Sequence, residues 1–202
     1  MRRARFLPFI LAAAVAACSD TGAPNTGGVK PPGELTIIQL PAASPPIWNP
    51  VASFYAKKGT DRELRMYFTA PLGGQGEEYM RLRVDAGSLY KRPDGTLFQV
   101  GDSVLITVTA DPQQIDFNFQ PSGLTFNPAL PAQLKIEYAE TGGDLDDDGD
   151  VDANDVAIEQ VIDMWRQEQP GQDFLKLGAV KIEELDEIEA DILGFTRYAI
   201  AY

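Results

Sequence analysis

The chain has 202 residues, a net charge of −13 and no histidine. The lack of histidine excludes Ser-His and Cys-His catalysis and histidine-ligated zinc. The acidic charge, with no Lys or Arg between Lys135 and Arg166, disfavours binding to nucleic acid or to anionic lipid headgroups. No spacing of carboxylates singles out a catalytic pair, so we do not expect an enzyme.

The N-terminus has the pattern of a signal peptide at residues 1–17. A basic start is followed by an apolar segment that is too short to cross a bilayer. Residues 15–18 (VAAC) resemble the lipobox of bacterial lipoproteins, which implies cleavage before Cys18 and acylation of that residue. Cys18 is the only cysteine, so no disulfide forms within the chain. The alternative is a lone cysteine in an ordinary secretory signal.

The lipobox resemblance also implies a location. We expect a protein held in the bacterial cell envelope by the lipid bilayer, because several acyl chains on one residue anchor a protein stably. Ser19 is compatible with the outer membrane or its periplasmic face rather than the inner membrane. Residues 18–34 are rich in Gly, Pro, Ser and Thr and predict a flexible, disordered linker. The folded domain is expected at residues 35–202.

The first half of this domain is predicted to consist of short strands and turns. Residues 36–40 form an apolar run that ends at a proline-rich segment. Alternation at residues 51–56 and 64–68, around a turn at 57–61, predicts a β-hairpin. Further strands are predicted where apolar residues alternate, and a turn where Pro and Gly occupy favourable positions. These strands lie at 80–84, 104–109, 115–119 and 134–138, and the turn lies at 92–95.

The C-terminal part begins with a stretch that is compatible with either a helix or a strand. We predict a helix from residue 154 to about residue 160, then a hairpin with strands at 162–167 and 174–177. Strands at 188–192 and 198–202 close the domain. Strands at such short intervals, with turns between them, indicate an all-β antiparallel β-sandwich.

An acidic stretch at residues 144–155 has the spacing of an EF-hand-type calcium loop. Asp stands at positions 1, 3, 5, 9 and 12, Gly149 at position 6 and an aliphatic residue at position 8. The carbonyl of position 7 can add an oxygen, and position 9 can act through a water. Ca²⁺ suits such a site because it prefers oxygen ligands and tolerates irregular coordination. The predicted metal-binding residues are Asp144, Asp146, Asp148, Asp150, Asp152 and Asp155. The alternative is a solvated loop that binds nothing.

Two segments resemble ZU5-type β-sandwich domains. Residues 119–138 contain a version of the pattern PxGLxFxxPxxLxIxY, and residues 194–200 are similar to the strand that closes many bacterial proteins of this group. The resemblance implies a β-sandwich with a structural or interaction role. It does not extend to self-cleavage, because Gly194 and Thr196 replace the histidine and serine on which that reaction depends.

The acidic loop and its exit, residues 143–158, are similar to one half of a dockerin. That resemblance implies side-chain ligation by Asp144, Asp146, Asp148 and Asp155, a carbonyl ligand from residue 150 and a water-mediated ligand from residue 152. Dockerins that bind cohesins carry two repeats, whereas this chain has one. We therefore expect the loop to stabilise the fold rather than to dock a cohesin.

A different class of function is a sugar- or peptide-binding adhesion module on the same sandwich. Its partner would be an envelope or extracellular protein or a glycan. Aromatic rings could supply a stacking platform for such a ligand. The candidate rings are Trp48, Tyr55, Tyr67, Tyr79 and Tyr90.

Overall fold

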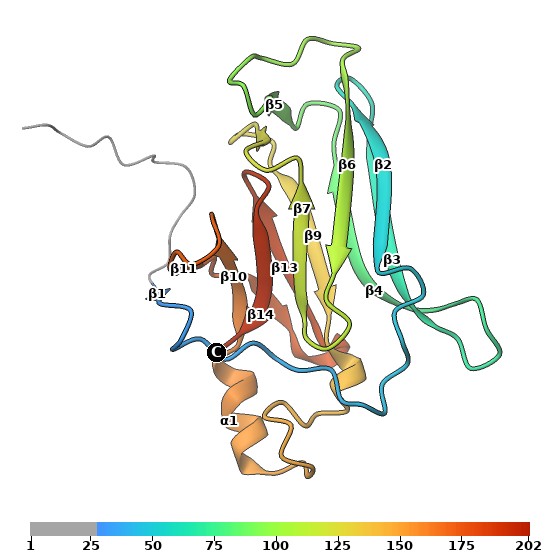
Figure 1. Cartoon of the computed structure of the whole chain (residues 1–202), viewed down its shortest axis with the longest axis vertical. Coiled ribbons are helices and arrows are strands. Elements are labelled where there is room, and N and C mark those ends of the chain that lie inside the picture. Colours follow the sequence, from blue (N-terminus) through green and yellow to red (C-terminus); the bar gives the residue numbers. More distant parts are fainter. Residues whose placement is uncertain (1–27) are drawn as a thin grey trace, which may run out of the picture.

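The alternating segments form strands that bury one face each and expose the other. A computed structural model describes residues 28–202, so the predicted signal peptide and Cys18 lie outside the described part of the chain. The described residues form two antiparallel sheets with one short α-helix at one end (Figure 1). The all-β sandwich predicted from the sequence is confirmed.

The larger sheet has seven strands. From edge to edge these are β1 (Val29–Lys30), β11 (Phe174–Lys176), β10 (Asp163–Gln167), β14 (Arg197–Ala201), β7 (Asp116–Gln120), β6 (Ser103–Ala110) and β2 (Val51–Lys57).

The second sheet has five strands. They are β12 (Val180–Ile182), β13 (Glu187–Ile192), β9 (Ala132–Glu137), β4 (Gln75–Val84) and β3 (Arg62–Thr69). The remaining elements are the pair β5 (Leu89–Lys91) and β8 (Thr125–Phe126), helix α1 (Ala153–Val161), and 3₁₀ turns at Ala139–Thr141 and Glu183–Leu185.

The core lies between the sheets and is rich in aromatic rings. Phe117 and Phe119 of β7 point into it, and both are fully buried. The ring centroid of Tyr79, on β4 of the other sheet, lies 5.0 Å from that of Phe117. Burying one such side chain contributes about 2–3 kcal/mol, so these contacts account for much of the attraction between the sheets.

Residues 51–57 and 62–69 form strands but not the predicted hairpin. β2 pairs with β6 and β3 pairs with β4, so the turn between β2 and β3 joins the two sheets. Backbone hydrogen bonds from Lys58 to Asp102 (2.9 Å) and from Gly59 to Ala86 (2.7 Å) hold this turn. Alternation identifies the buried residues of a strand but not its neighbour, because strands of both sheets face the same core.

The N-terminal part of the domain also differs from its prediction. Residues 36–40 are not a continuous strand, but they pair with the sheet through isolated bridges of Ile37 with Ala201 and of Gln39 with Gln114, and Ile38 is buried in the core. In contrast, β1 lies inside the predicted linker and pairs with β11. The end of this segment is ordered because an open sheet edge offers it hydrogen-bonding partners.

The helix and the strands predicted after the acidic loop are present, and β12 is an additional strand. Helix α1 covers residues 153–161 and ends where Ile162 turns to an extended conformation (φ −56°, ψ 146°). β10 and β11 form the predicted hairpin. None of the helices in residues 28–202 is long and apolar enough to span a bilayer.

Candidate metal centre

The acidic loop lies in the connection between the two sheets. It leaves β9 of the five-stranded sheet through the 3₁₀ turn at Ala139–Thr141 and enters α1, which leads to β10 of the seven-stranded sheet. The loop and α1 project from one end of the sandwich, beside the C-terminus (Figure 1). Leu145, at position 2 of the loop, is buried in the main core and anchors the loop to the sandwich. The sequence reasoning missed this anchor, although an apolar residue among acids was a visible signal.

The backbone of the loop folds around its first aspartate. The amides of Asp148 and Gly149 each donate to a carboxylate oxygen of Asp144, at 3.1 Å in both cases. Gly149 has a φ of 100°, which L side chains rarely adopt, and Asp147 has a φ of 55°. These two positive φ values close the turn. Asp147 is exposed, as expected for a residue outside the ligand set.

Three of the six predicted ligands converge on one point. Oxygen atoms of Asp144, Asp146 and Asp148 lie within 4.8 Å of one another. One carboxylate oxygen of Asp146, Oδ1, is buried without a hydrogen-bond partner. A buried, unpaired carboxylate oxygen is unfavourable unless a cation or donor satisfies it. The residues present therefore fit a hard cation that prefers oxygen ligands.

The electrostatics of the loop reflect crowding of like charges. Loss of solvation, and then the neighbouring carboxylate of Asp148, raise the pKa of Asp146. The carboxylates of Asp148 and then Asp152 raise the pKa of Asp150, whose side chain is exposed. Both shifts mean that the negative charges repel one another. A divalent cation among them would relieve this repulsion.

Asp155 and Asp152 have additional roles that the sequence reasoning did not anticipate. The carboxylate of buried Asp155 accepts hydrogen bonds from the amides of Leu145 (2.6 Å) and Asp152 (2.8 Å). The pKa of Asp155 is lowered, chiefly by the hydrogen bond from the amide of Asp152. Burial raises this pKa, but the further hydrogen bond from the amide of Leu145 lowers it again. Asp152 in turn accepts from the amide of Asn154 at 2.6 Å and caps α1. The three-carboxylate group does not include these two aspartates. The carboxylate of Asp155 instead joins the two ends of the loop.

Three of the five candidate rings of the aromatic platform do not share one surface. Tyr79 is fully buried in the core, where its ring contacts Phe68 and Phe117. Tyr55 and Tyr90 are exposed, but they belong to β2 and β5, which lie in different sheets. These three rings therefore divide between the core and separate surface elements. Exposed Trp48 is joined to Tyr67 by a backbone hydrogen bond of 2.9 Å.

The ZU5 and dockerin resemblances rest on the local residues that carry them and remain expectations about fold and loop. Neither a family model, nor a curated protein, nor a solved structure matches the chain.

Proposed function

We propose that this protein is a calcium-binding β-sandwich lipoprotein of the bacterial cell envelope, with a structural or interaction role rather than a catalytic one. Acylated Cys18 would hold it on the membrane. One Ca²⁺ would order the acidic loop that connects the two sheets. The observation that carries the calcium proposal is the convergence of Asp144, Asp146 and Asp148 in a loop with EF-hand spacing.

The chemistry of the site favours Ca²⁺ over other common cations. All candidate ligands are oxygens, which suits a hard cation, and the described residues include no histidine or cysteine to attract zinc. Mg²⁺ requires near-ideal octahedral geometry and gives up water reluctantly, whereas Ca²⁺ tolerates irregular coordination. Extracellular modules bind Ca²⁺ at about 10⁻⁴–10⁻³ M. We expect an affinity in this range.

The position of the loop explains why binding would matter for the fold. Leu145 ties the start of the loop to the core, and α1 follows its end. A cation that draws the three carboxylates together would stabilise the only connection between β9 and β10. Ligands that bind only the native state increase its stability in proportion to the logarithm of their concentration.

Titration calorimetry with Ca²⁺, Mg²⁺ and a chelator, combined with thermal unfolding, tests the proposal. We expect Ca²⁺ to bind and to raise the melting temperature, and Asp144→Ala and Asp148→Ala to abolish both effects. Asp147→Asn is the matched control, because it removes an exposed charge of the same loop and tolerates the positive φ. An unchanged calcium response in both alanine variants would refute the assignment.

A further inference from the structure

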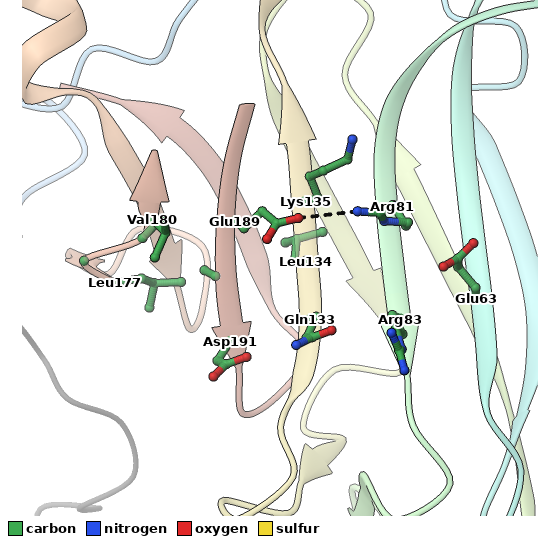
Figure 2. A pocket seen from close by; sticks show the side chains of 13 residues that line it. Glu63, Arg81, Arg83, Gln133, Leu134, Lys135, Leu177, Val180, Glu189 and Asp191 are labelled. Carbon is green, nitrogen blue, oxygen red and sulfur yellow. Dashed lines mark hydrogen bonds and ion pairs between the residues drawn. The ribbon is translucent and has the colours of Figure 1, made fainter. Parts of the chain in front are cut away.

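A groove lies on the outer face of the five-stranded sheet, away from the acidic loop. Its volume is about 460 Å³, which falls within the range of small-molecule sites. Its floor consists of side chains of β4, β9 and β13, with Glu63 of β3 at one side (Figure 2). One wall is formed by residues 177–179, which connect β11 to β12, and by Val180 at the start of β12; Leu177 and Val180 contribute aliphatic side chains.

The floor has two rows of polar side chains that run across the strands. In the first row, Arg81 of β4, Lys135 of β9 and Glu189 of β13 occupy paired positions. Nη2 of Arg81 lies 3.4 Å from Oε1 of Glu189, so the base and the acid meet across β9. Figure 2 shows this contact above the middle strand. The first row is therefore closed by its own ion pair.

The second row repeats this arrangement one pleat further along, but it stays open. Arg83, Gln133 and Asp191 occupy the paired positions on the same three strands. Nε of Arg83 instead contacts Oδ1 of Asp85 at 2.7 Å. Within residues 28–202, Asp191 has no ion-pair partner, and its side chain is one methylene shorter than that of Glu189.

In the second row, Arg83 and Asp191 therefore both face the groove without pairing with each other. β13 and β4 are separated by β9, so their backbones are about 10 Å apart. The guanidinium of Arg83 keeps donors that Asp85 does not use, and Gln133 between the two strands offers both a donor and an acceptor. A ligand with a carboxylate for Arg83 and an ammonium group for Asp191 would pair both charges of the second row, as the ion pair of Arg81 with Glu189 does in the first row.

We propose that this groove binds a small zwitterion of amino-acid to dipeptide size. The carboxylate of the ligand binds Arg83, its ammonium group binds Asp191, and an apolar side chain packs on Leu177 and Val180. Charge complementarity selects this class, because Arg83 and Asp191 carry opposite charges. Glu63, which lies beside Arg83 on β3, is already bound by Arg65 at 2.5 Å. The groove shares no residue with the acidic loop, so this site is independent of calcium binding.

Titration calorimetry of the full chain with L-leucine and with dileucine tests the proposal. Each blocked form of leucine removes one charge: N-acetyl-leucine lacks the ammonium group and leucinamide lacks the carboxylate. We expect leucine or dileucine to bind at least tenfold more tightly than either blocked compound, because each charged hydrogen bond contributes a factor of that size. Glucose, which is neutral and carries many hydroxyl groups, is the competing ligand class.

Three variants assign the binding to the open row. Asp191→Asn and Arg83→Gln should each weaken binding about tenfold or more. Asp173→Asn, which removes an exposed acid outside the groove, should leave it unchanged. Thermal unfolding verifies that each variant is folded. The proposal is overturned if neither ligand binds at about 10 mM, if the blocked compounds or glucose bind equally well, or if the two groove variants bind as the unaltered chain does.

Discussion

Arg197 and Asp116 form a bidentate ion pair across two neighbouring strands of the larger sheet. Nε of Arg197 lies 3.0 Å from Oδ1 of Asp116, and Nη2 lies 2.5 Å from Oδ2. Nη1 of the same arginine donates to Oε1 of Gln167 at 3.0 Å. One guanidinium therefore links β7, β14 and β10, and its partner Asp116 is buried.

Replacing Asp116 should destabilise the fold. Asp116→Asn leaves the guanidinium of Arg197 without its carboxylate, and we expect a loss of about 2 kcal/mol in the free energy of unfolding. The loss is smaller than for a fully buried pair because Arg197 is partly exposed. Urea denaturation measures the effect, with Asp173→Asn as an exposed control. Equal stability of the two variants would show that the pair contributes little.

Lys135 should stabilise the outer face of the five-stranded sheet. Its Nζ lies within 3.1 Å of carboxylate oxygens of Glu78, Glu137 and Glu187. Lys135→Met would leave three neighbouring acids uncompensated, at a cost of about 3 kcal/mol. Denaturant unfolding checks the value, and Lys57→Met, at an exposed position, serves as the control.

The same network predicts the alkaline behaviour of the protein. Burial lowers the pKa of Lys135, but the hydrogen bonds with Glu137, Glu78 and Glu187 outweigh it, so the pKa is raised. A raised pKa gives a contribution to stability that is complete below the ordinary value of 10.5 and is lost as the pH rises above it. The difference in stability between the unaltered chain and Lys135→Met should therefore be constant from pH 7 to about pH 10. A difference that declines within this range would contradict the assignment.

Asp102 provides a test at acidic pH. The backbone amide of Gln99 and then the guanidinium of Arg92 lower the pKa of Asp102 below its ordinary value of 3.8. A lowered pKa gives a contribution to the stability of the fold that is present above the ordinary pKa value and is lost as the pH falls below it. The NMR shift of the Gln99 amide, which donates to Oδ2 of Asp102 at 2.9 Å, should titrate with a midpoint below 3.8. Asp102→Asn should remove this titration, and a midpoint above 3.8 would be inconsistent with the geometry.

Removal of calcium should affect the acidic loop far more than the sandwich. Hydrogen exchange of the amides at residues 144–155 should accelerate when a chelator is added. Without the cation the crowded carboxylates repel one another, which weakens the hydrogen bonds that hold the loop around Asp144. Amides of β7, in the centre of the larger sheet, should keep their protection. Uniform acceleration across both regions would indicate that the loop is not a separate, metal-dependent unit.

The proposed membrane anchoring depends on Cys18, which lies outside the described part of the chain. Cys18→Ser should abolish incorporation of labelled palmitate in a bacterial host and should release the protein from the membrane fraction. Ser19→Ala is the adjacent control and should still be acylated. Labelled Cys18→Ser protein would rule out acylation at this cysteine.

The sequence by itself predicted the all-β class and the positions of most long strands, although it missed β1 and predicted a strand at residues 36–40 that does not form. Alternation at residues 115–119 and 134–138 predicted β7 and β9, and the spacing of the acidic stretch located the convergent Asp144, Asp146 and Asp148. These features are local, because alternation, turn residues and loop spacing act over a few residues. A local pattern therefore suffices to recognise them.

Only the tertiary structure decided which strands are neighbours and which side chains meet. β2 pairs with β6 rather than with β3, and β1 joins the sheet from within a segment predicted as linker. Arg197 reaches Asp116 across 81 residues, and the open row of Arg83 and Asp191 exists only because β9 lies between their strands. Strand pairing depends on contacts between distant segments that compete for one core, and no local pattern encodes the outcome of that competition.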